Sequence, residues 1–442
     1  MSGQVSTQSP ENGAAGRSDV FDIAITGIGI VTPLGVGCSV NVDRLLAGDS
    51  AITHEIPRGV ESCGAIASAR CPDFDLGGLL RFPKSIKYMS RPVQLAMRAA
   101  IEAFESSGLE RSRIDPYRLA IYTASGQTGL DYTDFSRAID FAWGADKEPD
   151  FGVLGGLPTK LIDPYFSLRT LGNGGMALLS TEFGAKGPSG NFVHSETAPA
   201  LALQAACADI AEGRCDAAIV GGFDSLLHPT SLFALTEAGV LTGDTAHFPQ
   251  MAPAEGAAFF ILERRADALQ RGADMVGEIL GIECSLEAPA RNREQFSGRG
   301  IRRLVRRLPA MCQSFQFAVS PGNTPRGIVE NVLGEMPLVS SPLVSSMTRA
   351  TGYLGAATAA VELALGLLSA RQGLAPSVMA MEESNGGLAI YDEPSAVIET
   401  LDPTGIFFSR SWTGQMAAIV ARAYSAAGAC YTEGKVYGAC AP

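Results

Sequence analysis

The chain passes twice through the same alternation of apolar strands and helices, and this repetition limits its possible folds more than any other feature. In the first half, strand patterns fall at 22–31, 119–124, 191–194, 217–222 and 255–262, with helical patterns at 40–47, 90–107 and 198–212. In the second half, strands are expected at 278–284, 317–320, 338–340, 405–409 and 417–421. Because no flexible linker separates the halves, the pattern predicts one internally duplicated α/β fold. We place the halves at residues 20–270 and 275–442, after a disordered polar tail at residues 1–19.

Composition and charge exclude several classes of protein. Hydrophobic residues make up 46% of the chain and charged residues 18%, so a large core is expected and general disorder is excluded. A net charge of −12 argues against nucleic acid or a membrane surface as the main partner. The longest apolar stretch, 354–370, contains Glu362 and is interpreted as a buried helix. Since the polar beginning of the chain lacks a secretory signal, we expect a cytoplasmic protein.

The nine cysteines are scattered along the chain. Their number is odd, and they show neither a paired framework nor the spacing of a zinc site. We therefore expect buried, reduced thiols and no metal centre.

The middle of the chain predicts a sharp strand-to-helix elbow. Gly187-Pro188-Ser189-Gly190 turns into the strand at 191–194, and the sequence then runs directly into the helix at 198–212. The first residues of such a helix present free backbone amides and favour a negative charge. The residues between strand and helix are therefore the first place to look for a reactive group.

Seven sequence strings occur in the order and spacing of the β-ketoacyl-acyl-carrier-protein synthases: ITGIGIVTPLG, AIYTASGQTG, DPYFSLRTLGN, GPSGNFVHSETA, GRCDAAIVGGFDS, AEGAAFFILE and SMTRATGYLGAATAAVE. The chain resembles this family over residues 21–425. The resemblance implies the thiolase fold, in which two similar βα halves stack as alternating helix and sheet layers, and it implies a dimer.

In active members of that family, a cysteine at the elbow accepts the acyl chain. The helix terminus lowers the pKa of such a thiol and so supplies the thiolate. A gapless count from Gly187 to the helix-ending Gly213 places that position on Glu196. A carboxylate keeps the favourable interaction with the helix terminus, but it cannot carry the thioester.

The family's two catalytic histidines are also missing. The chain has four histidines, at 54, 194, 228 and 247, and none lies in the second half. By resemblance, the first catalytic histidine corresponds to Ser320 and the second to Gly352, with an uncertainty of one residue at Gly352. The family's lysine falls at Ser345. His194 beside the elbow and Cys207 within the following helix are better explained as structural residues.

A synthase-like chain without these groups resembles the chain-length factor, the non-condensing subunit of type II polyketide synthases. The resemblance implies a heterodimer with an active ketosynthase, whose acyl tunnel this subunit completes. It also implies phosphopantetheine delivered by an acyl carrier protein, with no cofactor bound to the chain itself. The family usually has glutamine at the elbow, so Glu196 departs from its pattern. Two alternatives remain open, a malonyl-carrier-protein decarboxylase and an acyl-binding homodimer.

Three sets of side chains are candidates for these roles. We expect Glu196 to pair with Arg349, because a buried carboxylate without a partner is costly. Bulky aromatic residues are expected to line the tunnel or the subunit interface, namely Tyr132, Phe135, Phe141 and Trp143. An arginine-rich segment is either a solvated helix face or a docking site for the acidic carrier protein, and its docking candidates are Arg299, Arg302, Arg303 and Arg306.

Overall fold

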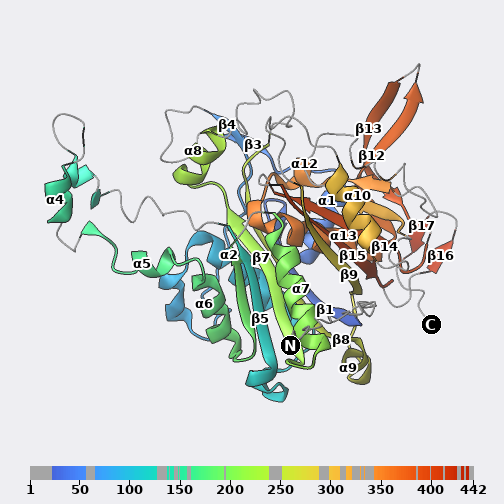
Figure 1. The fold of residues 1–442 in the computed structure, drawn as a ribbon, viewed down its shortest axis with the longest axis horizontal. Coiled ribbons are helices and arrows are strands. Elements are labelled where there is room, and N and C mark those ends of the chain that lie inside the picture. The colour runs from blue at the N-terminus through green and yellow to red at the C-terminus, as the bar shows by residue number, and fades with distance from the viewer. Residues whose placement is uncertain are drawn as a thin grey trace, which may run out of the picture.

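The computed structural model describes most of the chain (Figure 1). The described residues are 22–55, 65–126, 137–138, 140–143, 148, 150–156, 161–193, 196–237, 251–287, 298–308, 315–320, 329, 333, 343–384, 387–398, 400–411, 414–425, 430–432 and 435–437. The predicted tail at residues 1–19 and the predicted strand at 338–340 lie outside them.

Five strands form the sheet of the first half. Their spatial order is β1, β8, β7, β5, β6, in which the first two pairings are antiparallel and the last two are parallel. The strands are β1 (Ile23–Thr32), β5 (Leu119–Ser125), β6 (Ser189–Val193), β7 (Ala217–Ser225) and β8 (Glu255–Arg264). Strand β6 is the outermost strand of this half.

The second half repeats this arrangement strand for strand. Its order is β9, β15, β14, β10, β11, again with two antiparallel pairings followed by two parallel ones. The strands are β9 (Gly277–Leu286), β10 (Phe317–Val319), β11 (Leu343–Ser345), β14 (Thr404–Arg410) and β15 (Gln415–Ala423). An antiparallel pairing of β1 with β9 joins the halves, so the predicted duplicated α/β fold is confirmed.

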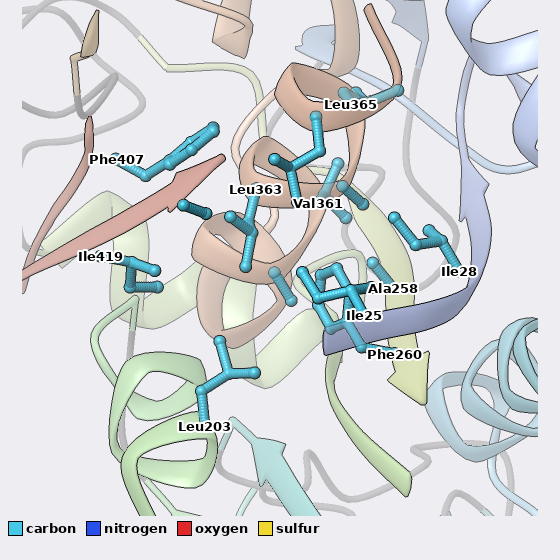
Figure 2. Packing of buried hydrophobic residues seen from close by; sticks show 14 of the residues in the cluster. Ile25, Ile28, Leu203, Ala258, Phe260, Val361, Leu363, Leu365, Phe407 and Ile419 are labelled. Atoms are coloured by element: carbon cyan, nitrogen blue, oxygen red, sulfur yellow. The ribbon is translucent and has the colours of Figure 1, made fainter. Parts of the chain in front are cut away.

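Helices α7 (Ala198–Ala211) and α13 (Thr358–Arg371) form the central layer. Side chains from both helices and from the strands of both halves belong to one hydrophobic cluster. Figure 2 shows this packing, in which Leu203 of α7 and Leu363 of α13 lie near Phe260 and Ile419. The central layer therefore holds the two halves together.

Outer helices cover the opposite faces of the two halves. Helix α2 (Arg91–Ser106) and helix α6 (Gly174–Phe183) pack on the first half, and α10 (Arg299–Arg307) packs on the second. Successive residues of one strand alternate between layers: Ala218 belongs to the central cluster and Ile219 to the outer one. Strands buried on both faces explain the continuous apolar runs of the sequence.

Two glycines allow α2 to approach β1 closely. A Cβ atom on Gly29 would lie 2.0 Å from the carbonyl oxygen of Ala99, and one on Gly27 would lie 2.0 Å from that of Ala103. Both are distances that real Cβ atoms do not reach. The ITGIGIV string thus fixes the spacing between the first sheet and its outer helix.

The apolar stretch 354–370 is a buried helix, as predicted. Helix α13 has buried residues on all its faces, including Glu362. Among the described residues, no helix combines the length and the apolar character needed to cross a membrane.

The remaining elements lie mainly at the edges of this core. The helices are α1 (Cys38–Leu46), η2 (Pro83–Tyr88), η3 (Arg111–Arg113), η4 (Pro116–Arg118), α4 (Phe151–Gly155), α5 (Phe166–Arg169), α8 (Pro229–Glu237), α9 (Arg265–Gln270), α12 (Thr348–Thr351) and η7 (Gly355–Ala357). The strands are β2 (Gly35–Val36), β3 (Thr53–Glu55), β4 (Ile66–Ser68), β12 (Leu374–Ser384), β13 (Gly387–Val397), β16 (Cys430–Thr432) and β17 (Lys435–Tyr437). The sequence analysis missed the long antiparallel hairpin of β12 and β13, although Asn385-Gly386 between the strands is a typical hairpin signal.

Candidate functional site

The elbow forms where the sequence predicts it. Strand β6 ends at Val193, and α7 begins at Ala198 with a proline in its first turn, a position that suits proline because the first helical amides have no partner within the helix. Glu196 lies between them, one residue before the N-cap Thr197, and only 2% of it is exposed. His194 and Ser195 lie outside the described residues. A buried carboxylate therefore stands at the start of the central helix.

Tyr353 holds this carboxylate. Its hydroxyl donates a hydrogen bond to Oε1 of Glu196, and the tyrosine is itself buried. The two residues come from opposite halves of the chain. The backbone of Tyr353 is held against the first half by hydrogen bonds with Ala252 (2.7 Å) and Ala254 (2.9 Å).

Gly352 forms the turn that aims Tyr353. It ends α12 with a φ of 76°, and a Cβ atom there would lie 2.8 Å from Cβ of Ala254 and 2.9 Å from the carbonyl oxygen of Ala252. A side chain at this position would be strained and crowded. The structure therefore brings Tyr353, rather than the adjacent Gly352, to the elbow residue.

Arg349 and Arg410 differ in their surroundings. The side chain of Arg349 is exposed, and its carbonyl oxygen accepts a hydrogen bond of 2.8 Å from Ser50, so its pairing with Glu196 stays a prediction. Arg410, at the end of β14, is buried. Burial lowers the pKa of the Arg410 guanidinium, while the negative charges of Glu287 and Glu196 oppose that change. The sequence analysis did not single out Arg410, which lies near the elbow only because of the sheet order.

Two further carboxyl groups complete what we call the buried acid cluster, Glu196, Asp224 and Glu362. Burial raises the pKa of Asp224 to about 7, and the negative charge of Glu196 adds to this shift. Hydrogen bonds from the backbone amides of Ala356 (2.9 Å) and Ser225 (2.8 Å) act in the opposite direction. Burial also raises the pKa of Glu362 well above its ordinary range, again with a contribution from Glu196. The buried surroundings of these carboxyl groups are therefore unfavourable for additional negative charge.

The other two positions assigned to the lost catalytic groups are buried hydroxyls. Ser320 follows β10, and its backbone amide donates to the carbonyl of Ser345, at the end of β11, over 2.8 Å. A serine hydroxyl cannot act as a general base at neutral pH. Cys207 lies within α7, and burial raises the pKa of its thiol, as expected of a structural cysteine. Within the described residues, no group of three or more His, Cys, Asp or Glu side chains could hold a metal ion.

The predicted aromatic set is partly described. Tyr132 and Phe135 lie outside the described residues, whereas Phe141 and Trp143 are 57% and 51% exposed. Other large apolar side chains of the same region are also exposed: Phe151, Val153, Leu168 and Leu171. Figure 1 shows α4 well away from the body of the molecule and α5 between it and α6. We call residues 137–172 the arm.

The predicted arginine-rich segment is the amphipathic helix α10. Its apolar side turns Ile301, Leu304 and Val305 into the outer core of the second half. Arg299, Arg303 and Arg306 are exposed, and Arg302 is half-buried. The surface location is confirmed, while carrier-protein docking stays a prediction.

Comparison with known proteins decides the family. The model of the β-ketoacyl synthase N-terminal domain matches residues 21–268, which is more than half of the chain. The chain belongs to the β-ketoacyl synthase family.

The relatives of this β-ketoacyl synthase family member include a subunit of a polyketide synthase and a 3-oxoacyl-acyl-carrier-protein synthase. The tetracenomycin polyketide synthase ketoacyl synthase beta subunit of Streptomyces glaucescens is 27% identical over 424 residues, covering 90% of this chain and 98% of that protein. The 3-oxoacyl-acyl-carrier-protein synthase 2 of Coxiella burnetii is 25% identical over 402 residues, covering 85% and 92%. The solved ishigamide ketosynthase/chain length factor has a TM-score of 0.75 and 21% identity, and covers 91% of this chain and 99% of its own. The thiolase fold is thereby confirmed.

Replacing Tyr353 by phenylalanine should destabilise the protein. The variant loses the hydroxyl that donates to a buried carboxylate, which costs roughly 1–3 kcal/mol of unfolding free energy. Urea unfolding followed by circular dichroism measures this loss. Tyr117→Phe is the matched control, because Tyr117 is 66% exposed and should unfold like the wild type. Equal midpoints for the two variants would contradict the proposed support of Glu196.

Replacing Glu362 by glutamine should stabilise the protein at alkaline pH. Burial raises the pKa of Glu362 in the folded state above its ordinary value of 4.5. The protein therefore has its full stability below pH 4.5, where Glu362 is protonated, and loses stability as the pH rises through the pKa of the folded state. The Glu362→Gln variant avoids that loss, because glutamine does not ionise. In thermal unfolding, its unfolding free energy should exceed that of the wild type only slightly at pH 5 and by roughly 1 kcal/mol or more at pH 8. The exposed Glu105→Gln is the control. A constant difference between the two pH values would contradict this explanation.

Proposed function

We propose that this chain is a non-catalytic subunit that pairs with an active β-ketoacyl synthase during decarboxylative chain elongation on an acyl carrier protein. The buried carboxylate of Glu196 at the start of α7, held by Tyr353, carries this proposal. A carboxylate cannot form the thioester that the elbow cysteine of an active synthase forms. The lack of any histidine beyond residue 247 removes the family's two catalytic histidines as well.

The surface of the first half supports a paired state. The arm exposes several large apolar side chains, and such patches on a soluble protein usually mark an interface. Strand β6, which leads into the elbow, is an outermost strand, and outermost strands are commonly covered in assemblies. We propose that the partner is an active ketosynthase and that Phe141 and Trp143 contribute to the interface or to its acyl tunnel. The similarity to the ketosynthase/chain length factor supports this choice of partner.

Phosphopantetheine enters this scheme only on the carrier protein. The name of the Coxiella relative states that it acts on acyl carrier protein, and we extend that partner to the complex proposed here. The carrier's arm would deliver its thioester to the partner's cysteine, while this chain shapes the apolar space that receives the growing product.

The electrostatics of the pocket argue against the decarboxylase alternative. A malonyl group would bring another carboxylate close to Glu196, in surroundings where burial already raises the pKa of Asp224 and Glu362 and the charge of Glu196 adds to both shifts. Repulsion between the carboxylates would weaken the binding of the malonyl group. For the second alternative, no observation on the described residues favours a homodimer over a heterodimer.

The test combines this chain with a candidate ketosynthase and a carrier protein. Native mass spectrometry should detect a one-to-one complex, and the complex should extend a carrier-bound thioester. Glu196→Ala should leave the extension rate within about threefold, because it removes no reacting group, whereas replacing the partner's nucleophilic cysteine should abolish it. Loss of all product in an intact Glu196→Ala complex would overturn the proposal. Acylation of this chain, or carbon dioxide release by it alone, would do the same.

Carrier-protein docking on α10 has its own test. Reversing the charge of the two exposed residues Arg303 and Arg306 should slow association with an acidic carrier protein about tenfold at low salt, because electrostatic attraction steers the encounter. The difference should shrink as ionic strength rises, since salt screens exposed charges. Arg113→Glu, another exposed arginine, on η3, is the control. Stopped-flow rates that match the wild type at low salt would remove the proposal.

A further inference from the structure

Polar side chains at the edge of the first sheet connect three parts of the chain. Asn191 of β6 accepts a hydrogen bond from Oγ1 of Thr123 (2.6 Å) and donates through Nδ2 to the carbonyl oxygen of Gly172 (2.9 Å). Ser125 donates over 3.4 Å to both Asn191 and Gly172. We call these four residues the amide node.

The amide node joins β5, which precedes the arm in the sequence, to the end of the arm. Ser125 is the last residue of β5, and the sequence leads from there into the arm. Gly172 lies between α5 and α6, where the arm returns. Asn191 is on the strand that continues to Glu196. One amide side chain therefore connects the returning end of the arm with β5 and with the strand that feeds the elbow.

Exposed apolar side chains lie on the returning segment of the arm and at the end of β6. Leu168, Leu171 and Val193 are each between 44% and 50% exposed. A Cβ atom on Gly172 would lie 3.6 Å from Cγ2 of Val193, so the returning segment contacts the outermost strand directly. A shift of this segment would move an apolar surface relative to the elbow.

We propose that Asn191 is a positioning residue that fixes the returning segment of the arm, residues 161–172, against β6 and thereby sets the depth of the acyl cavity shared with the partner. The inference rests on the proposed function, because only a paired subunit shapes such a cavity. An asparagine suits the role since it accepts from Thr123 and donates to Gly172 at once. An aspartate of the same size keeps the first hydrogen bond but places an acceptor against the Gly172 carbonyl.

Asn191→Asp in the reconstituted complex tests the inference. Hydrogen exchange in peptides covering 161–172 should become about tenfold faster, because one hydrogen bond is replaced by repulsion. The product-length distribution of the complex should shift, while thermal unfolding and partner affinity stay close to the wild type. Asn173→Asp is the matched control: it adds the same charge one residue from Gly172, and its side chain makes no capping bond to α6. This control should change neither measurement.

Thr123→Val is the second variant, in case Asn191→Asp folds poorly. It removes only the donor to Asn191 and should raise arm exchange by a smaller, several-fold factor. Unchanged exchange in both variants would overturn the inference, and so would faster exchange with unchanged products. If no complex forms with any ketosynthase, the proposed function fails instead, and the exchange result still reports on the node.

Discussion

The packing of α7 and α13 between the two halves is the constraint on which the rest of the structure depends. Both helices contribute to one cluster with the strands of both halves, and the elbow residue just before α7 meets a tyrosine that precedes α13. The layer has little room for change, since interiors are packed as densely as crystals of small molecules. A chain whose elbow residue changes while this layer is kept therefore keeps the fold of the family.

Most of the sheet framework could be predicted because its strands are buried on both faces. Residues such as Ala218 and Ile219 point into different layers yet are both apolar, so the strand appears as a continuous run rather than an alternation. The short strand β11 was not predicted, although the equally short β10 lies within the predicted strand at 317–320. The duplicated order of the strands was easier to recognise than their limits.

The site was predicted less completely than the fold. Glu196 could be located because an uninterrupted strand, elbow and helix surround it. Tyr353 lies within the one-residue uncertainty of the position assigned to Gly352, but its contact with Glu196 depends on the turn after α12, which the sequence does not reveal. Arg410 has no local signal at all, because its proximity to Glu196 follows from the pairing of β14 with distant strands.

The hydrogen bond between Tyr353 and Glu196 spans 157 positions of the sequence. During synthesis, the elbow glutamate emerges from the ribosome long before its tyrosine has been translated. The nascent first half must therefore keep that carboxylate hydrated, and its final burial awaits a helix that arrives late in translation.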